Sequence, residues 1–309
     1  MPHDDGAALT AAETTGFSAD KPMFVVQQAT SPADAHWTTT GDHTGSDVTL
    51  AAEPAARAYD EIGNLVTSTT GVGSTSPKYY NLYFTTAISF DVLLITGHNF
   101  ASTELTSVAL EIADDDPFSS NKREIAKWTR GSVTADDRIL ITNLNSEGGS
   151  STYSAGGTAQ RYSSVTHARL VVTHAGDKDP ELGEIWLGRR YQLQRNPDVP
   201  WNNKNEMSRV ADYVSNSGIT KRYTFYRGQA LRSFQSSIAA AAEITVIDNW
   251  FNAINEGTRP FVYIETPSSS AQAQIMMLDE AGLSFPLVGP TERRLAFSMT
   301  EQPPFLSRE

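Results

Sequence analysis

The sequence predicts a mainly β protein: an antiparallel jelly-roll sandwich plus a smaller α+β domain, in which a sheet carries one helix. Short apolar runs separated by Gly, Asn, Asp, Ser and Pro clusters recur from residue 48 to about residue 193. Long helical periodicity is missing from that stretch. The one clear amphipathic helical pattern comes later, at residues 238–255. These observations place the sandwich before the helix.

The chain divides into three expected segments. Residues 1–47 form an N-terminal arm and a first strand, residues 48–195 the jelly-roll domain, and residues 196–309 the α+β domain. The beginning of the arm is rich in Ala, Thr, Asp and Gly with little periodicity, which is typical of an extended or disordered segment. Pro197 and Pro200 keep the boundary between the two domains extended.

The sandwich is expected to contain strands whose number and spacing are typical of a jelly roll. The predicted strands are Tyr79–Thr85, Ile88–Thr96, Ser107–Ile112, Arg138–Thr142, Ala168–Val172 and Glu184–Leu187. Two conspicuous loops interrupt them, the acidic turn at residues 114–117 and a Ser/Gly-rich excursion at residues 145–158.

The C-terminal part predicts strands around one helix. Ile244, Ile247, Phe251 and Ile254 recur at three- and four-residue spacing, which gives the helix one apolar face. Gly257 is the residue best suited to a left-handed helix stop. The strands expected in this part and at the N-terminus are Met23–Val26, Arg222–Arg227, Phe261–Ile264, Gln274–Leu278 and Arg294–Met299.

Composition excludes several classes of function. The net charge of −12 and the lack of Lys/Arg clusters argue against nucleic acid as a partner. Cysteine is absent, which excludes disulfides, thiolate metal sites and cysteine nucleophiles. A run of about 18 apolar residues is also absent, so we expect no membrane insertion. The acidic N-terminus lacks the features of a secretory signal.

Catalytic motifs are missing as well, and we expect no enzymatic activity and no cofactor. The serines do not form a Gly-x-Ser-x-Gly elbow, and Gly71-Val72-Gly73 is too short for a dinucleotide fingerprint. A pair of carboxylates across a cleft, as in a glycosidase, is not excluded by sequence alone.

A few residues are candidates for ligand or interface contacts. His98 follows Gly97 at the end of an apolar strand. There its ring either hydrogen-bonds the turn, with Asn99 left-handed, or touches a ligand. Asp114, Asp115 and Asp116 offer oxygen ligands for calcium, but without EF-hand spacing a solvated turn is the simpler interpretation, and we expect no metal.

Aromatic residues offer rings that stack on sugars or fill protein interfaces. Tyr153, in the Ser/Gly-rich loop, is the best candidate for an exposed ring, whereas Trp186 lies inside a strand and is expected in the core.

Several motifs together resemble a known family. Gly97-His98-Asn99-Phe100 closes an apolar strand, and the sequence Leu182-Gly183-Glu184-Ile185 opens another. With Ala168-Arg169-Leu170-Val171-Val172, this pattern resembles the discoidin-like or carbohydrate-binding-module-like jelly rolls of tailed-bacteriophage tail proteins. Phe100 stands where the family usually has Leu. The C-terminal half resembles the partner domain of such distal-tail-like proteins, through Pro260-Phe261-Val262 and a terminal strand that closes in Glu301-Gln302-Pro303.

The resemblance implies a virion structural protein of the tail tip, distal tail or baseplate. It implies a ring subunit that is made in the host cytoplasm and contacts copies of itself and tail-tube, hub or baseplate proteins. The alternative is a carbohydrate- or receptor-binding module for host surface glycans. A polysaccharide-degrading enzyme is a third and weaker hypothesis. Neither catalytic nor sugar-binding residues are carried over from the family.

Overall fold

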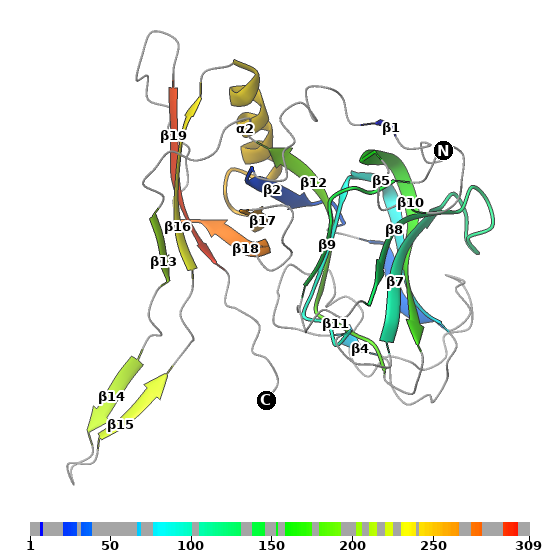
Figure 1. Ribbon diagram of the computed structural model, residues 1–309, viewed down its shortest axis with the longest axis horizontal. Coiled ribbons are helices and arrows are strands. Elements are labelled where there is room, and N and C mark those ends of the chain that lie inside the picture. Colours follow the sequence, from blue (N-terminus) through cyan, green and yellow to red (C-terminus); the bar gives the residue numbers. More distant parts are fainter. Residues whose placement is uncertain are drawn as a thin grey trace.

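The computed structural model describes residues 7–8, 21–29, 32–38, 67–68, 77–100, 105–130, 138–145, 153, 158–174, 179–192, 202–205, 210–214, 220–224, 230–238, 241–265, 273–279 and 293–301. Within them the chain is mainly β, with antiparallel sheets and one helix, which confirms the predicted fold class. A β-sandwich lies on one side of the molecule, and a sheet that carries the helix lies on the other (Figure 1).

The first sheet of the sandwich, here called the outer sheet, has the strand order β3-β5-β10-β7-β8, and β1 pairs with β10. Along β10, Ala168, Leu170 and Val172 face the apolar interior while Arg169 faces away, as the two-residue period of a strand requires. The strands are β1 (Ala7–Ala8), β3 (Asp34–Thr38), β5 (Lys78–Phe90), β7 (Leu105–Ala113), β8 (Arg123–Thr129) and β10 (Gln160–His174).

The second sheet has nine strands in the order β13-β16-β19-β18-β17-β2-β12-β6-β9. Its strands are β2 (Met23–Gln27), β6 (Val92–Thr96), β9 (Arg138–Ile141), β12 (Glu184–Gln192), β13 (Asn202–Asn205), β16 (Ala230–Ile238), β17 (Phe261–Ile264), β18 (Ala273–Leu278) and β19 (Arg293–Glu301). Because β2 pairs with both β12 and β17, one continuous sheet runs from the sandwich into the C-terminal part.

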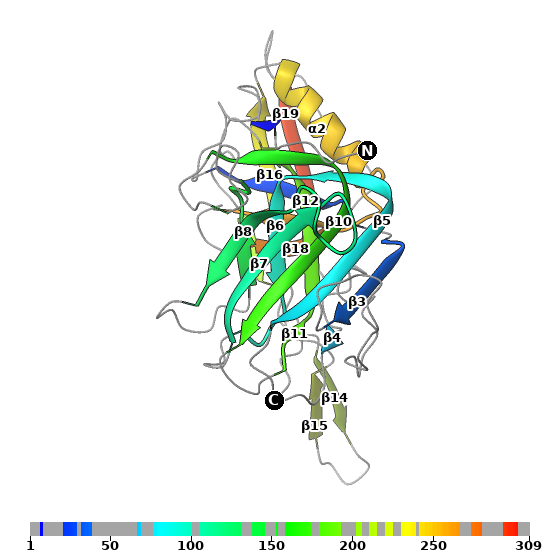
Figure 2. The same cartoon turned by 90° about the vertical axis from the view of Figure 1, so that its right-hand side faces the viewer.

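Two small ribbons complete the described strands. In one, β4 (Thr67–Ser68) pairs with β11 (Glu181–Leu182) beneath the sandwich. In the other, β14 (Val210–Val214) pairs with β15 (Thr220–Thr224). Figures 1 and 2 show the β14–β15 ribbon projecting away from the other labelled strands.

The nine-stranded sheet curls upon itself. The guanidinium of Arg138 on β9 donates a hydrogen bond to the backbone carbonyl of Ala273 on β18, although several strands separate them in the sheet. The curled strands enclose an apolar cluster that includes Trp186, which is fully buried as the sequence predicts. The opposite face of β6, β9 and β12 contributes residues such as Ile95 and Ile185 to the sandwich core. The same strands therefore serve two cores.

Helix α2 (Ala241–Ala253) covers one face of the C-terminal part of this sheet. Its Trp250 is fully buried and stacks on Phe24 of β2, with ring centroids 4.5 Å apart. Trp250 also meets Phe261 edge-on at 5.0 Å. Stacked and edge-to-face rings of this kind add to the stabilisation from burial, so they fix the helix on the sheet.

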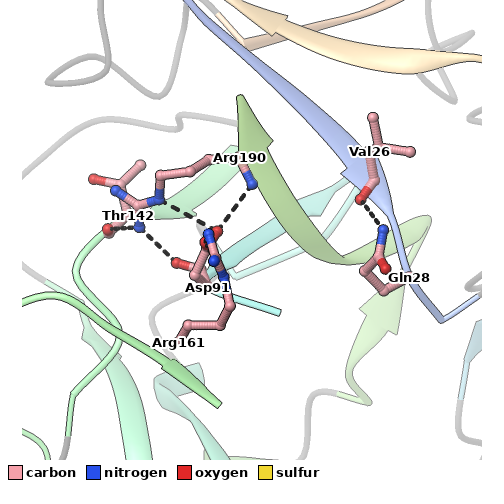
Figure 3. A network of polar contacts seen from close by, with 6 residues as sticks. All are labelled: Val26, Gln28, Asp91, Thr142, Arg161 and Arg190. Carbon is pink, nitrogen blue, oxygen red and sulfur yellow. Dashed lines mark hydrogen bonds and ion pairs between the residues drawn. The ribbon is translucent and has the colours of Figure 1, made fainter. Parts of the chain in front are cut away.

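A buried ion-pair network ties the outer sheet to the nine-stranded sheet (Figure 3). Asp91, between β5 and β6, is 0% exposed. Its carboxylate accepts hydrogen bonds from the Arg161 guanidinium of β10 at 2.7 Å and from the Arg190 amide of β12 at 3.0 Å. Arg190 also donates to the Asp91 backbone carbonyl at 2.7 Å and to that of Thr142. Charged hydrogen bonds thus link the strands of both layers.

The predicted strands of the sandwich and of the C-terminal sheet are present with different bounds, except Arg222–Arg227. The described part of that segment belongs to β15 of the separate β14–β15 ribbon, so its expected place in the sheet with the helix is wrong, and residues 225–227 lie outside the described residues. Tyr79–Thr85 and the start of the next predicted strand are a single strand, β5, and the chain turns only at Asp91. The sequence did not predict β1, β3, β4, β8, β11, β13, β14 and β16. The helix is shorter than predicted, and Gly257 is left-handed at φ +91° as expected, although Asn255 and Glu256 before it are left-handed too.

The predicted N-terminal arm and the predicted domain boundary fall largely outside the described part of the chain. Of residues 1–20, the structure describes only Ala7 and Ala8. The predicted boundary at residues 195–201 lies outside the described residues. Ala7 and Ala8 pair with Arg161 and Gln160 of the same chain. Within the described part of the chain, no helix is both long and apolar enough to cross a membrane.

Candidate functional site

His98 lies in the turn after β6, and its ring stabilises that turn. Its Nδ1 accepts a hydrogen bond from the Phe100 amide at 3.1 Å, and its ring stacks on that of Phe100 with centroids 4.8 Å apart. The predicted hydrogen bond to the turn is therefore present. The left-handed residue is Gly97 at φ +64°, so the prediction that placed Asn99 in this conformation is wrong. The Asn99 amide instead donates to the Asp179 carbonyl at 2.7 Å and accepts from the Glu181 amide at 3.0 Å.

In the acidic turn, the Asp115 carboxylate accepts hydrogen bonds from residues of the same turn. One oxygen of that carboxylate accepts from the amides of Ser119 and Ser120 at 3.0 and 2.7 Å, and the other accepts from the Ser119 hydroxyl at 2.8 Å. These hydrogen bonds lower the pKa of Asp115 from 3.8 to about 2. Asp114 and Asp116 are half-buried neighbours in the same turn. Asp115 therefore stabilises its own turn, as Asp residues commonly do by hydrogen-bonding nearby backbone amides.

Tyr153 is half-buried and packs against the sandwich core. Its hydroxyl donates to the Asn143 side-chain oxygen at 3.2 Å, and burial raises the pKa of this phenol. The ring of Tyr153 is therefore only partly exposed, with one side against the sandwich core.

The structure does not bring the five predicted contact residues together. His98 lies beside Trp128 of β8, which pairs with Val108 near the start of β7, whereas Asp114 follows the end of β7. His98 therefore lies at one end of the sandwich, whereas Asp114, Asp115 and Asp116 lie at the other. Across the described ranges, no group of three or more His, Asp or Glu residues is arranged to hold a metal ion.

A different set of polar and aromatic residues gathers on the solvent side of the outer sheet. The pairing register places Asp34 of β3 opposite Tyr83 of β5, and Tyr83 opposite His167 of β10. His36 follows two residues after Asp34, on the same side of β3. We call Asp34, His36, Tyr83 and His167 the Tyr83 platform. Figure 2 shows β3, β5 and β10 side by side.

The platform is a ring flanked by a carboxylate and two imidazoles. The Tyr83 and His167 rings lie 4.9 Å apart with an interplanar angle of 35°. The His36 Nδ1 lies 3.3 Å from an Asp34 carboxylate oxygen. The Asp34 side chain is 53% exposed and that of His36 is 16% exposed, while Tyr83 and His167 are half-buried. The Tyr83 and His167 rings are therefore fixed by neighbouring side chains, while part of each ring remains accessible to solvent.

Next to the platform, Arg169 is held under aromatic rings. Its guanidinium binds one Glu111 carboxylate oxygen with two nitrogens, each at 2.7 Å. It also lies 4.8 Å from the Tyr79 ring centroid and 4.1 Å from that of Phe118. Lys122 pairs with the other Glu111 oxygen at 3.0 Å. Because Arg169 is almost fully buried and paired, it braces this face of the sheet.

Sequence reasoning missed the platform, although one signal was present. Tyr79, Asn81 and Tyr83 alternate with apolar residues at a two-residue period, which predicts a polar, aromatic face on this strand. The neighbours Asp34 and His167 are far away in the sequence, and only the pairing register shows that they border Tyr83.

Comparison with known proteins finds carbohydrate-binding modules among the solved structures. No family model and no curated protein matches the chain. Among solved structures, a family 32 carbohydrate-binding module from Clostridium perfringens in complex with galactose is 14% identical with a TM-score of 0.33, and the match covers 54% of this chain and 98% of that one. Another Clostridium perfringens module, in complex with GalNAc-β-1,3-galactose, is 15% identical with a TM-score of 0.32, covering 50% and 94%.

A longer enzyme matches over part of its length. A GH29 fucosidase from Ruminococcus gnavus, in complex with fucose, is 12% identical with a TM-score of 0.33; the match covers 52% of this chain and 26% of the fucosidase. This chain thus spans about a quarter of that enzyme. The ligands named for these proteins are properties of those proteins.

Proposed function

We propose that this chain is a non-catalytic glycan-binding protein, and that the Tyr83 platform is its binding surface. The observation that carries the proposal is the row Asp34–Tyr83–His167 across three neighbouring strands. An aromatic ring packs against the C–H face of a sugar, which is apolar, while a carboxylate accepts charge-assisted hydrogen bonds from sugar hydroxyls. The platform offers both kinds of contact on one rigid sheet.

The proposal includes no turnover of the glycan. A glycosidase needs two carboxyl groups on either side of the scissile bond. The platform row contains one carboxylate, that of Asp34, and continues through Tyr83 and His167 to Ala113. The row therefore lacks the second carboxyl group that this kind of hydrolysis uses.

The test is a titration of the full chain with a broad panel of oligosaccharides, followed by amide and side-chain NMR. Binding should shift the signals of β3, β5 and β10, and Tyr83→Ala should weaken it about five-fold or more, since a stacked ring contributes roughly 1 kcal/mol or more. Lys127→Ala, an exposed change on β8 at the far edge of the same sheet, should leave binding unchanged. The absence of binding to the whole panel would overturn the proposal.

A second candidate function is assembly as a structural subunit of a virion tail, at the tail tip, distal tail or baseplate. The β14–β15 ribbon favours it. A lone two-stranded hairpin is only marginally stable in water, so a projecting ribbon gains stability when a partner surface covers it. Copies of this chain, or tail-tube, hub and baseplate proteins, are the proposed partners. The site of action would then be the virion.

Size-exclusion chromatography with light scattering tests the assembly role. The full chain should form an oligomer, and a variant in which a short Gly-Ser linker replaces residues 210–224 should be a monomer that still binds glycan. A full chain that stays monomeric, alone and with tail proteins, would remove this candidate.

A further inference from the structure

The turn between β7 and β8 folds back over the outer sheet and reaches the edge of the Tyr83 platform. Phe118 in this turn is 5% exposed, although it lies on the solvent side of the sheet. Its ring covers the Arg169 guanidinium at 4.1 Å and meets the His167 ring edge-on, with centroids 6.3 Å apart and an interplanar angle of 84°. Phe118 is thus the link between the turn and the platform.

Phe118 has an unusual backbone. Its φ is +63°, a left-handed conformation that a bulky aromatic residue rarely adopts. Strain of this kind persists only where surrounding contacts enforce it, and it clusters at functional sites. Here the enforcing contacts come from Asp115. Its carbonyl accepts from the Phe118 amide at 3.0 Å, and its carboxylate accepts three hydrogen bonds from Ser119 and Ser120.

We propose that Asp115 is a positioning residue for the glycan site: by closing the 114–121 turn, it holds Phe118 against the edge of His167 and so fixes the His167 ring beside Tyr83. The inference rests on the proposed function, since it concerns the shape of the same surface. It gives the acidic turn a role that needs no calcium ion. A ring fixed before binding loses less rotational freedom when the ligand arrives, which strengthens binding.

Other features of the turn agree with this role. Hydrogen bonds from backbone and hydroxyl donors hold the pKa of Asp115 at about 2, so the carboxylate stays ionised and keeps these hydrogen bonds into the acidic pH range. The amide of Asp114 donates to the Ser120 carbonyl at 3.1 Å and closes the base of the turn. Beneath the turn, the Arg169–Glu111 pair gives the Phe118 ring a fixed cation to cover.

The experiment compares three variants of the full chain. Asp115→Ala removes the three carboxylate hydrogen bonds, Asp115→Asn keeps one side-chain acceptor, and Phe118→Leu removes the ring while it leaves Asp115 in place. The first readout is the chemical shifts of the His167 ring protons, which depend on the rings beside them. The second readout is the affinity for an oligosaccharide that the wild type binds.

Asp115→Ala and Phe118→Leu should both move the His167 ring signals in the same direction and weaken binding about three- to ten-fold, the range expected for a lost aromatic contact. Asp115→Asn should lie between wild type and Asp115→Ala. Lys127→Ala should change neither readout. His167 signals and affinity that stay at wild-type values in Asp115→Ala, with the chain still folded, would overturn the inference.

The two proposals fail in different ways. A wild-type chain that binds no glycan overturns the proposed function. The His167 signals then still show whether Asp115 and Phe118 position the ring. Unchanged His167 signals in a chain that does bind glycan overturn the positioning role alone. If Asp115→Ala does not fold, Phe118→Leu supplies the same ring readout with the turn intact.

Discussion

At the scale of single residues, the most consequential charge is Asp91. It is fully buried and shared by Arg161 and Arg190 on different sheets. Asp91→Asn keeps the shape but leaves the buried guanidinium of Arg190 and the half-buried one of Arg161 without their counter-ion. We expect a loss of about 3–5 kcal/mol in the free energy of unfolding, measured by urea denaturation.

The matched control for Asp91 is Glu124→Gln. Glu124 pairs with Lys127 at 3.5 Å near the surface, and this change should cost less than about 1 kcal/mol. An equal loss of free energy of unfolding in the two variants would show that the ion pairs of Asp91 do not stabilise the contact between the sheets.

Asp115 predicts a pH dependence of stability. Its pKa is lowered on folding, from 3.8 to about 2, so the folded state binds fewer protons and the stabilisation is present above pH 4. It is lost as the pH falls through the folded pKa of about 2. Wild type should therefore be more stable than Asp115→Asn at pH 5, and the gap should narrow between pH 4 and pH 2. A gap that does not depend on pH would contradict this account.

At the scale of elements, β12 and β2 pack so closely that residue 188 must be glycine. A Cβ added to Gly188 would lie 2.1 Å from Val25 Cγ1, in the core enclosed by the curled sheet. Gly188→Ala should therefore destabilise the protein by about 1–3 kcal/mol.

A second substitution tests the cause of that loss. Val25→Ala removes the methyl group that Gly188→Ala meets, so the double variant should be more stable than the sum of the two single losses predicts, by about 1 kcal/mol or more. Additive losses in thermal or urea unfolding would show that another contact excludes the Cβ.

The elements also show what sequence patterns can predict. Apolar runs such as Phe261–Ile264 were assigned correctly because burial on a sheet requires them. The platform was not found, since Asp34, Tyr83 and His167 meet only through the pairing of three distant strands. Phe118 was missed for a related reason: its left-handed backbone lies in a turn that is held by hydrogen bonds to Asp115, whereas glycine is the residue that marks such a conformation in a sequence.

At the scale of the whole molecule, the nine-stranded sheet makes one body of two expected domains. β2 pairs with β12 of the sandwich and with β17 of the C-terminal part. A fragment of residues 1–195 would lose β17 and leave Met23 and Val25, which are fully buried, in contact with water.

The fragment should therefore fail to unfold cooperatively, whereas the full chain should show one transition by circular dichroism and by Trp fluorescence. A fragment with a sharp transition of its own and the amide spectrum of the sandwich would show two independent domains.

We propose that a sheet braced by buried charges presents Tyr83 and its neighbours to a sugar. The most direct measurement is a crystal structure of the full chain soaked with the oligosaccharide that it binds best. We predict an intact sugar ring against Tyr83, with hydroxyls at the Asp34 carboxylate. A sugar bound at the other end of the sandwich beside His98, or a ligand cleaved in the crystal, would contradict the account.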